Sequence, residues 1–295
     1  MIRGTKSAIL PVICVVVVGF LVAAAGQMAA GRDSAKVDKM IRQMLAAREN
    51  QEQIAYLTAT YGSFSMAEAY EIQAALAKRL SRTLGDVAGY KVAYASKAAQ
   101  EQFGVDEPAY GPLFSLGRLP SGSRLPTEEI MEVTLETEVA FTISGRISRP
   151  IKSVEELKSY VKWVHAAFDI GDYRFISAEA RPTPQDMIAS GVGAHFYTLG
   201  PAAAPDAFDV DAATLKLARD GETIVESAAT NVMGSPWNSL LWLANHLVRH
   251  GGGLKPGDVV LTGTAAPAYK AKAADMKGSY EGDCGALGKV TLTIY

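Results

Sequence analysis

Two glutamates, Glu136 and Glu138, lie two residues apart in an otherwise apolar segment, "LETEVAF" (residues 135–141). Alternate residues of a β-strand share one face, with Cα atoms about 7 Å apart. A solvated strand face would explain such a pair, but the apolar flanks predict burial. Two buried carboxylates are costly to ionise together unless a positive charge joins them. A hard divalent cation such as Mg²⁺, which prefers carboxylate oxygens, would supply that charge.

A metal site of this kind needs a third protein ligand. The segment "AAFDIGDYRF" offers Asp169 and Asp172, although Asp172 could instead form a structural ion pair with Arg174. Lys91, in the apolar context "GYKVAY", is either a surface lysine or a group that approaches an anionic substrate. The residues alone leave both alternatives open.

Two other groups of polar residues are less informative. His246 and His250 have a spacing that permits metal binding on a helix, but no glutamate follows His246 as in a zinc protease helix, which favours structural roles. Gly263, in "LTGTAAP", predicts a turn after a strand, with Thr262 and Thr264 as candidate hydroxyl donors. The sequence contains no Gly-rich phosphate loop and no nucleophile elbow.

The elements that must position these residues follow from hydrophobic periodicity and capping patterns. Helices are predicted over residues 34–56, 65–84, 153–167 and 238–250. Strands are predicted over residues 90–95, 132–144, 196–199, 214–218, 223–227, 258–262 and 289–295, and a loop over 105–114. Hairpin signals such as Asp220-Gly221 outnumber strand–helix alternations. The pattern predicts an α+β fold with a mixed, mostly antiparallel β-roll or sandwich and an N-terminal helical segment.

Composition limits the class of protein. The chain has 295 residues, 48% of them hydrophobic and 20% charged, which is typical of a globular protein with a large core. A net charge of −2 gives no basic surface, so nucleic-acid binding is not expected. Of the two cysteines, Cys14 lies in the N-terminal apolar segment, so Cys284 alone would remain after removal of that segment and no intrachain disulfide is expected.

The first thirty residues have the layout of a secretory signal peptide. Arg3 and Lys6 precede an uncharged run over residues 8–25, and an alanine-rich stretch follows. A retained membrane anchor and a misleading apolar run are the alternatives. We therefore expect a leader or anchor over residues 1–30, a catalytic domain over residues 34–295, and an exported protein, periplasmic or extracellular.

Five segments occur in an order that resembles the 2-keto-4-pentenoate hydratase family of the fumarylacetoacetate hydrolase superfamily. They are "GYKVAYASKAAQEQFGVDEPAYGPLF", "LETEVAF", "AAFDIGDYRF" with "TPQDMIAS", "GSPWNSLLWLANHL" and "LKPGDVVLTGT". The resemblance covers residues 35–295. It implies a fumarylacetoacetate hydrolase C-terminal-domain-like fold and a Mg²⁺- or Mn²⁺-dependent lyase acting on 2-oxo acids from aromatic catabolism. We also expect a homo-oligomer.

The resemblance assigns roles to particular residues. It implies metal ligands at Glu136, Glu138 and Asp169, an active-site lysine at Lys91, and a Gly-Thr turn, Gly263-Thr264, that holds the substrate carboxylate.

Two positions depart from the family pattern. The third ligand is Asp169 where glutamate is usual, and Ala109 replaces an aspartate to which proton transfer has been ascribed. The expected function is hydration of a 2-hydroxypenta-2,4-dienoate-like substrate. The alternatives are 2-oxo-acid decarboxylation, C–C hydrolysis, or an exported oxo- or dicarboxylate-binding protein with little turnover.

Overall fold

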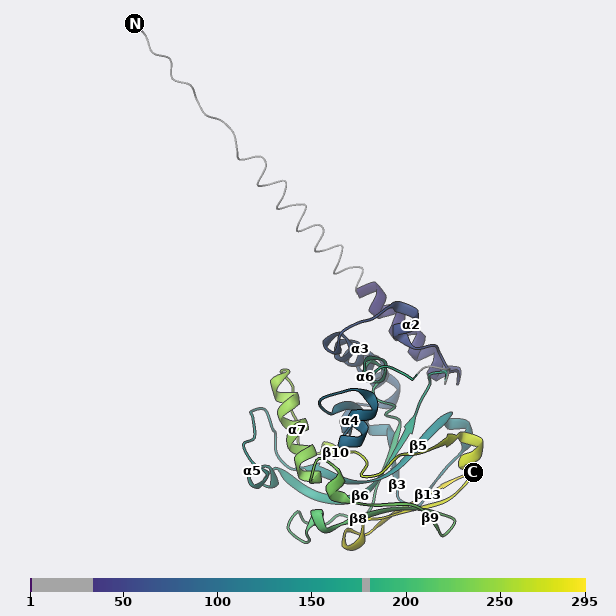
Figure 1. Ribbon diagram of the computed structural model, residues 1–295, viewed down its shortest axis with the longest axis vertical. Coiled ribbons are helices and arrows are strands. Elements are labelled where there is room, and N and C mark those ends of the chain that lie inside the picture. Colours follow the sequence, from purple (N-terminus) through teal and green to yellow (C-terminus); the bar gives the residue numbers. More distant parts are fainter. Residues whose placement is uncertain (2–33, 177–180) are drawn as a thin grey trace. The chain divides into compact units, whose positions relative to one another are not determined.

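A computed structural model describes residue 1 and residues 34–176 and 181–295 (Figure 1). The predicted leader lies outside these residues. Within the described part of the chain, no helix combines the length and apolarity needed to span a membrane. Residues 44–295 form one compact unit, distinct from residues 1–43, and contain every predicted site residue. The helix predicted over 34–56 ends at residue 49.

Eight strands form the larger sheet, and most neighbours are antiparallel. Its order is β2 (Ala109–Phe114), β1 (Val87–Ala93), β10 (Val259–Leu261), β5 (Glu132–Ile143), β6 (Val161–Asp172), β7 (Phe196–Leu199) and β3 (Arg118–Pro120), and β11 (Tyr269–Lys272) also pairs with β5. The β1–β10 and β3–β7 pairs are parallel. The predicted strands 132–144 and 196–199 are therefore confirmed.

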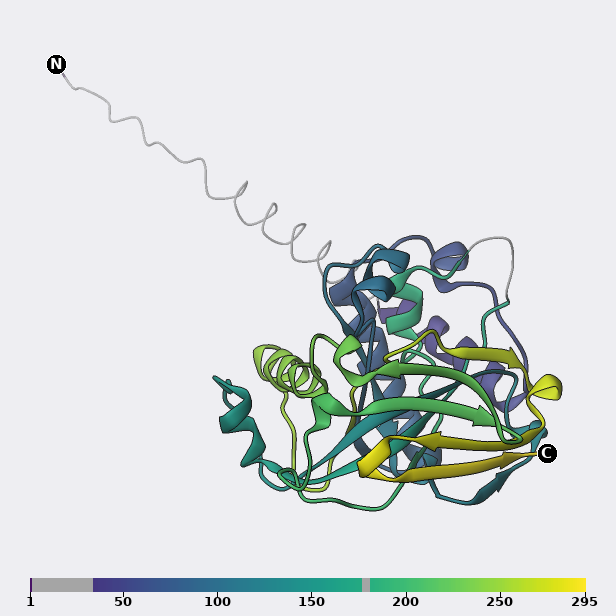
Figure 2. The same ribbon diagram turned by 60° about the horizontal axis from the view of Figure 1, so that its bottom comes forward.

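A second sheet of five strands lies against the first, and its green and yellow arrows cross the front of the view in Figure 2. Its order is β4 (Ser123–Leu125), β13 (Lys289–Ile294), β12 (Gly278–Asp283), β8 (Thr214–Arg219) and β9 (Glu222–Ala228). Leu135 and Phe168 of the first sheet pack with Leu217 and Tyr280 of the second. This core confirms the predicted α+β class with two packed, mostly antiparallel sheets.

The helices lie outside the sheets. Among the described residues from 57 onward, they are α2 (Leu57–Tyr61), α3 (Met66–Leu84), α4 (Lys97–Phe103), α5 (Val154–Lys158), α6 (Pro184–Ala189) and α7 (Pro236–Arg249). Ser65 and Glu68 form the predicted capping box of α3. The apolar side of α7 covers a second core, in which the rings of Trp237 and Phe141 lie 4.3 Å apart.

Two sequence predictions were wrong. Residues 109–114, predicted as loop, form β2, because Pro112 is tolerated in an edge strand that pairs with a single neighbour. The helix predicted over 153–167 ends at Lys158, and residues 161–172 form β6. Since β6 is buried on both faces from Val164 to Asp172, its sequence lacks the alternation that marks a half-exposed strand.

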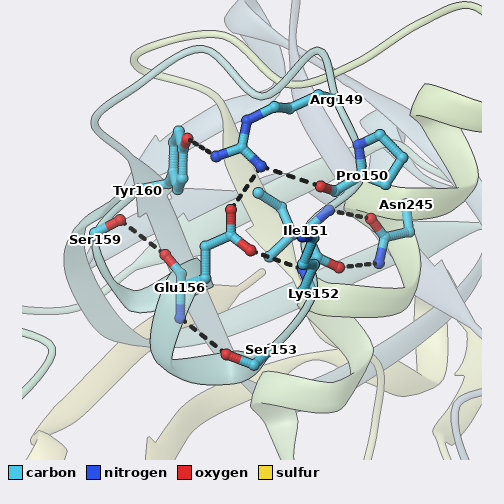
Figure 3. Close-up of polar contacts among 9 residues, drawn as sticks. All are labelled: Arg149, Pro150, Ile151, Lys152, Ser153, Glu156, Ser159, Tyr160 and Asn245. Atoms are coloured by element: carbon cyan, nitrogen blue, oxygen red, sulfur yellow. Dashed lines mark hydrogen bonds and ion pairs between the residues drawn. The ribbon is translucent and has the colours of Figure 1, made fainter.

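The connection from β5 to β6 is held against α7 by a polar network (Figure 3). Asn245 on α7 accepts a hydrogen bond from the Ile151 amide at 2.7 Å and donates one to the Ile151 carbonyl at 2.9 Å. Glu156 pairs with Arg149 at 2.7 Å and accepts the Lys152 amide at 2.8 Å. These contacts fix the ends of the two longest strands, which carry the acidic residues.

Candidate metal centre

Three carboxylates converge on one face of β5 and β6. Asp169 lies directly opposite Glu136 in the antiparallel register, and Glu138 is the next residue of β5 on that face. One carboxylate oxygen from each lies within 4.8 Å of the others, and no other such acidic cluster occurs among residues 34–176 and 181–295. The strand pairing thus brings together the three residues named from the sequence.

Two buried oxygens of this cluster have neither a hydrogen-bond partner nor an ion-pair partner within the described residues. They are Glu138 Oε1 and Asp169 Oδ1, and both residues are 0% exposed. An unsatisfied buried acceptor costs about 1–3 kcal/mol, more when charged. The second Glu138 oxygen accepts the Gly263 amide at 2.7 Å. Converging, unsatisfied carboxylate oxygens fit a divalent cation such as Mg²⁺ or Mn²⁺.

Lys91 enters the cluster from β1. Its ammonium forms an ion pair with Asp169 Oδ2, and its side chain is 3% exposed. Burial alone would lower the pKa of Lys91, but the Asp169 carboxylate raises it above its usual value. Lys91 is therefore a buried, charged residue at the site and not a surface lysine, which decides one of the alternatives left open by the sequence.

The pKa values of both glutamates are raised. Burial, followed by the charge of Asp169, raises the pKa of Glu136 to about 8 and that of Glu138 well above its usual value. Glu136 is the partly exposed member of the cluster. The raised pKa values disfavour ionisation of the two glutamates without a cation, and a cation would displace protons on binding.

A cavity of about 900 Å³ opens beside the cluster. Lys91, Glu136 and Thr264 line it together with three tyrosines, Tyr56, Tyr94 and Tyr173. Apolar side chains, among them Phe103, Phe175, Met187 and Val192, form other parts of its wall. A largely apolar cavity with a few converging polar groups is typical of a small-molecule site.

The Gly263-Thr264 turn lies at the cluster, as expected, but its groups are engaged within the protein. The Gly263 amide donates to Glu138, and the Thr264 hydroxyl donates to the Ala266 carbonyl at 2.9 Å. Gly263 has φ +93°, and a Cβ there would lie 2.5 Å from the Ala95 Cβ. The turn thus orients a carboxylate of the cluster, while its contact with a substrate remains a prediction.

The remaining sequence candidates lie elsewhere. Asp172 pairs with Arg174 at 2.6 Å, which confirms the structural alternative for that aspartate. Ala109 is 1% exposed and lies opposite Ala93 in the β1–β2 register. Its methyl group offers no acid or base. His246 packs between aromatic rings of Tyr70, Tyr110 and Trp242.

The polar residues of the cavity wall that the sequence did not single out include Tyr94, Thr134 and Tyr173. Tyr173 stands in a quoted motif but was not singled out, and neither were Tyr94 and Thr134. The hydroxyl of Tyr94 is buried and has no hydrogen-bond partner within the described residues. Thr134 could have been found, because it precedes Glu136 by two residues and so shares its face.

The two packed sheets and the carboxylate cluster define the class of protein. Residues 92–290 match the fumarylacetoacetate hydrolase C-terminal family, and the chain belongs to that family.

The chain is also similar in sequence to individual hydratases. A 2-keto-4-pentenoate hydratase of Burkholderia vietnamiensis (strain G4 / LMG 22486) is 30% identical over 265 residues, which are 89% of this chain and 98% of the relative. A 2-hydroxyhexa-2,4-dienoate hydratase of Comamonas testosteroni is 27% identical over 226 residues, 75% and 84% of the two chains. The similarity to these hydratases thus extends well beyond the site segments.

A solved structure supports the fold. The 4-oxalocrotonate decarboxylase from Pseudomonas putida G7, complexed with magnesium and adipate, superimposes with a TM-score of 0.82 at 20% identity, covering 89% of this chain and 98% of the other. At that identity the likeness establishes a shared fold.

Proposed function

We propose that the protein is a divalent-metal-dependent hydratase that acts on a small 2-oxo acid of the 2-hydroxypenta-2,4-dienoate type. The observation that carries the proposal is the convergence of Glu136, Glu138 and Asp169, with unsatisfied oxygens, at the wall of a cavity. The names of the hydratase relatives support the substrate class. A role in aromatic catabolism follows from the same comparison.

The three carboxylates would hold the cation, Mg²⁺ or Mn²⁺. When bound, it would supply Lewis-acid polarisation of the substrate's 2-oxo group. Asp169 would reach the cation with Oδ1, because Lys91 pairs with Oδ2. The Gly263 amide fixes the orientation of Glu138, so the cluster is held before a ligand arrives.

Lys91 would have two effects in this site. Its ammonium offsets part of the negative charge of the carboxylates, which would otherwise repel an anionic substrate. It also lines the cavity, where it would attract the substrate carboxylate. The Gly263-Thr264 turn would contact that carboxylate once the Thr264 hydroxyl leaves its bond to Ala266.

Ala109 supports a second candidate function. A buried methyl group at the position of the family's acid leaves the chain without that proton donor. The same metal site could then serve 2-oxo-acid decarboxylation, C–C hydrolysis, or binding of an oxo- or dicarboxylate with little turnover. These differ from hydration in products and not in the metal centre.

A spectroscopic assay separates the candidates. We expect Mg²⁺-dependent loss of the dienol absorbance of 2-hydroxypenta-2,4-dienoate, with a hydrated product by mass spectrometry, and abolition by EDTA or by Glu136→Ala. Release of CO₂ from a 2-oxo dicarboxylate would support decarboxylation. Saturable binding with unchanged absorbance would support a binding protein, and no Mg²⁺-dependent binding or turnover of any 2-oxo acid would reject the proposal.

We also propose that the protein is exported, on the basis of the charged and then apolar composition of residues 1–25. Fractionation of the native host and an intact mass of the purified protein test this. Cleavage near residue 30 would lower the mass by about 3 kDa. A retained anchor would leave a protein of full mass in the membrane fraction. Homo-oligomerisation stays a prediction, which light scattering would test.

A further inference from the structure

Tyr173 follows the last residue of β6 and lies in the wall of the cavity. Its amide donates to the Glu132 carbonyl at 2.9 Å, which fixes the backbone. Its ring lies against Gly193, where a Cβ would be 2.8 Å from the ring carbons. Since a larger residue at 193 would displace the ring, the position of Tyr173 is set by packing as well as by its strand.

Several other polar residues of the cavity wall are engaged within the protein. The Ser227 hydroxyl donates to the Ala265 carbonyl at 2.9 Å, and Asn231 donates to that carbonyl at 3.1 Å. The Thr264 hydroxyl donates to the Ala266 carbonyl. The donors of Ser227, Asn231 and Thr264 would have to break existing bonds before they could contact a ligand, whereas the Lys91 ammonium has three N–H groups and pairs with Asp169.

The surroundings of Tyr173 favour a neutral hydroxyl. Burial raises the pKa of Tyr173 to about 12, against the opposing effects of the Lys91 charge and of a hydrogen bond with the neighbouring Thr134 side chain, and Glu136 and Asp169 act in the same direction as burial. The phenol therefore keeps its proton at neutral pH and can donate it in a hydrogen bond. Tyr173, Lys91 and Glu136 line the same cavity.

We propose that Tyr173 is a ligand-contacting residue, whose hydroxyl donates a hydrogen bond to an oxygen of a 2-oxo acid bound at the carboxylate cluster. The inference rests on the proposed function, since it takes the ligand from there. A hydrogen bond from a neutral donor to a charged oxygen is short and strong, particularly in a cavity of low polarity. Tyr173 would thereby supply a donor in a site where Ala109 offers none.

Oxalate, a stable mimic of the 2-oxo-acid group, tests the inference by calorimetry in the presence of saturating Mg²⁺. We expect Tyr173→Phe to weaken oxalate binding about 10- to 100-fold, because a hydrogen bond to a charged group is lost. Mg²⁺ affinity, measured without oxalate, should stay within about two-fold of wild type, since the three carboxylates remain. Tyr110→Phe is the matched control, because Tyr110 stacks on Tyr70 and does not line the cavity.

The outcomes separate this inference from the proposed function. Equal oxalate affinity in wild type and Tyr173→Phe would overturn the role of Tyr173 and leave the metal site intact. Parallel losses of Mg²⁺ and oxalate affinity would also overturn it, because they would indicate a structural role. Failure of wild-type protein to bind oxalate with Mg²⁺ would reject both. In turnover assays, the inference predicts a changed KM or kcat for Tyr173→Phe with unchanged thermal stability.

Discussion

Asp169 faces Glu136 directly across the β5–β6 ladder, so two of the three converging carboxylates are cross-strand partners. The spacing between these strands is set by backbone hydrogen bonds and not by a loop. Glu138 lies on the same face of β5 as Glu136, because alternate residues of a strand point to one side. Its carboxylate accepts a hydrogen bond from the Gly263 amide. The acidic cluster is therefore rigid before any cation binds, which is the arrangement that favours selective coordination.

Loss of one carboxylate should remove metal binding. For Glu138→Gln we expect Mn²⁺ affinity to fall by at least about 100-fold, because an anionic ligand becomes a neutral amide. Electron paramagnetic resonance titration of free Mn²⁺ measures this. Glu281→Gln is the control, since Glu281 forms an exposed ion pair with Lys289. Similar affinities in the two variants would contradict a metal site at Glu138.

Metal affinity should rise with pH. The pKa of Glu136 is raised to about 8, by burial and then by Asp169, so a cation must displace a proton below that pH. We expect Mg²⁺ affinity to increase from pH 6 to pH 8, with proton release on binding. Calorimetry in two buffers of different ionisation enthalpy measures that release. Binding without proton release at pH 6.5 would contradict the prediction.

The same shift predicts how stability depends on pH without metal. A raised carboxyl pKa contributes stability that is fully present below the unfolded value, about 4.5, and is lost as pH rises through about 8. We expect the unfolding free energy in EDTA to fall across that range. Mg²⁺ should reduce the fall, because bound cation replaces the proton. The prediction would be contradicted if the free energy of unfolding, measured with urea, depended on pH in the same way with EDTA and with Mg²⁺.

Lys91→Met should destabilise the metal-free protein. Removing one partner of a buried ion pair leaves Asp169 uncompensated, which costs about 3–5 kcal/mol. Lys289→Met is the control, because its pairs with Glu281 and Asp283 lie at the surface, where solvent screens them and they contribute little to stability. Denaturant unfolding in EDTA compares the two. A loss of stability in Lys91→Met no larger than that in Lys289→Met would contradict a stabilising role for the buried Lys91–Asp169 pair.

Two glycines with nearly the same backbone conformation give a matched pair. Gly263 has φ +93° and Gly257 has φ +91°, so alanine is strained at both by about 1–3 kcal/mol. A Cβ at 263 would meet the Ala95 Cβ at 2.5 Å, whereas a Cβ at 257 meets nothing within 4 Å. We expect Gly263→Ala to lose more stability and also Mg²⁺ affinity, through displacement of Glu138. Equal effects at both positions would refute a close fit at Gly263.

Local sequence predicted several elements because their signals lie within a few residues. The capping box at Ser65 and Glu68 begins α3. Asp220 and Gly221, with φ +51° and +87°, turn the β8–β9 hairpin. By contrast, the sequence predicts a helix that continues to residue 167, over the first part of β6, and a loop where β2 forms. Pairing with β5 and β1 decides their conformation, and those partners are distant in sequence.

The sequence by itself determined that Glu136 and Glu138 share a face, because the period of a strand is two residues and the flanks are apolar. Family resemblance added Asp169 and Lys91 as partners. The tertiary structure decided the rest. Strand pairing placed Asp169 opposite Glu136, the β1–β10–β5 order brought Lys91 to the same site, and the packing of Tyr173 against Gly193 placed a phenol beside them. Such contacts join residues far apart in the chain, so no local pattern encodes them.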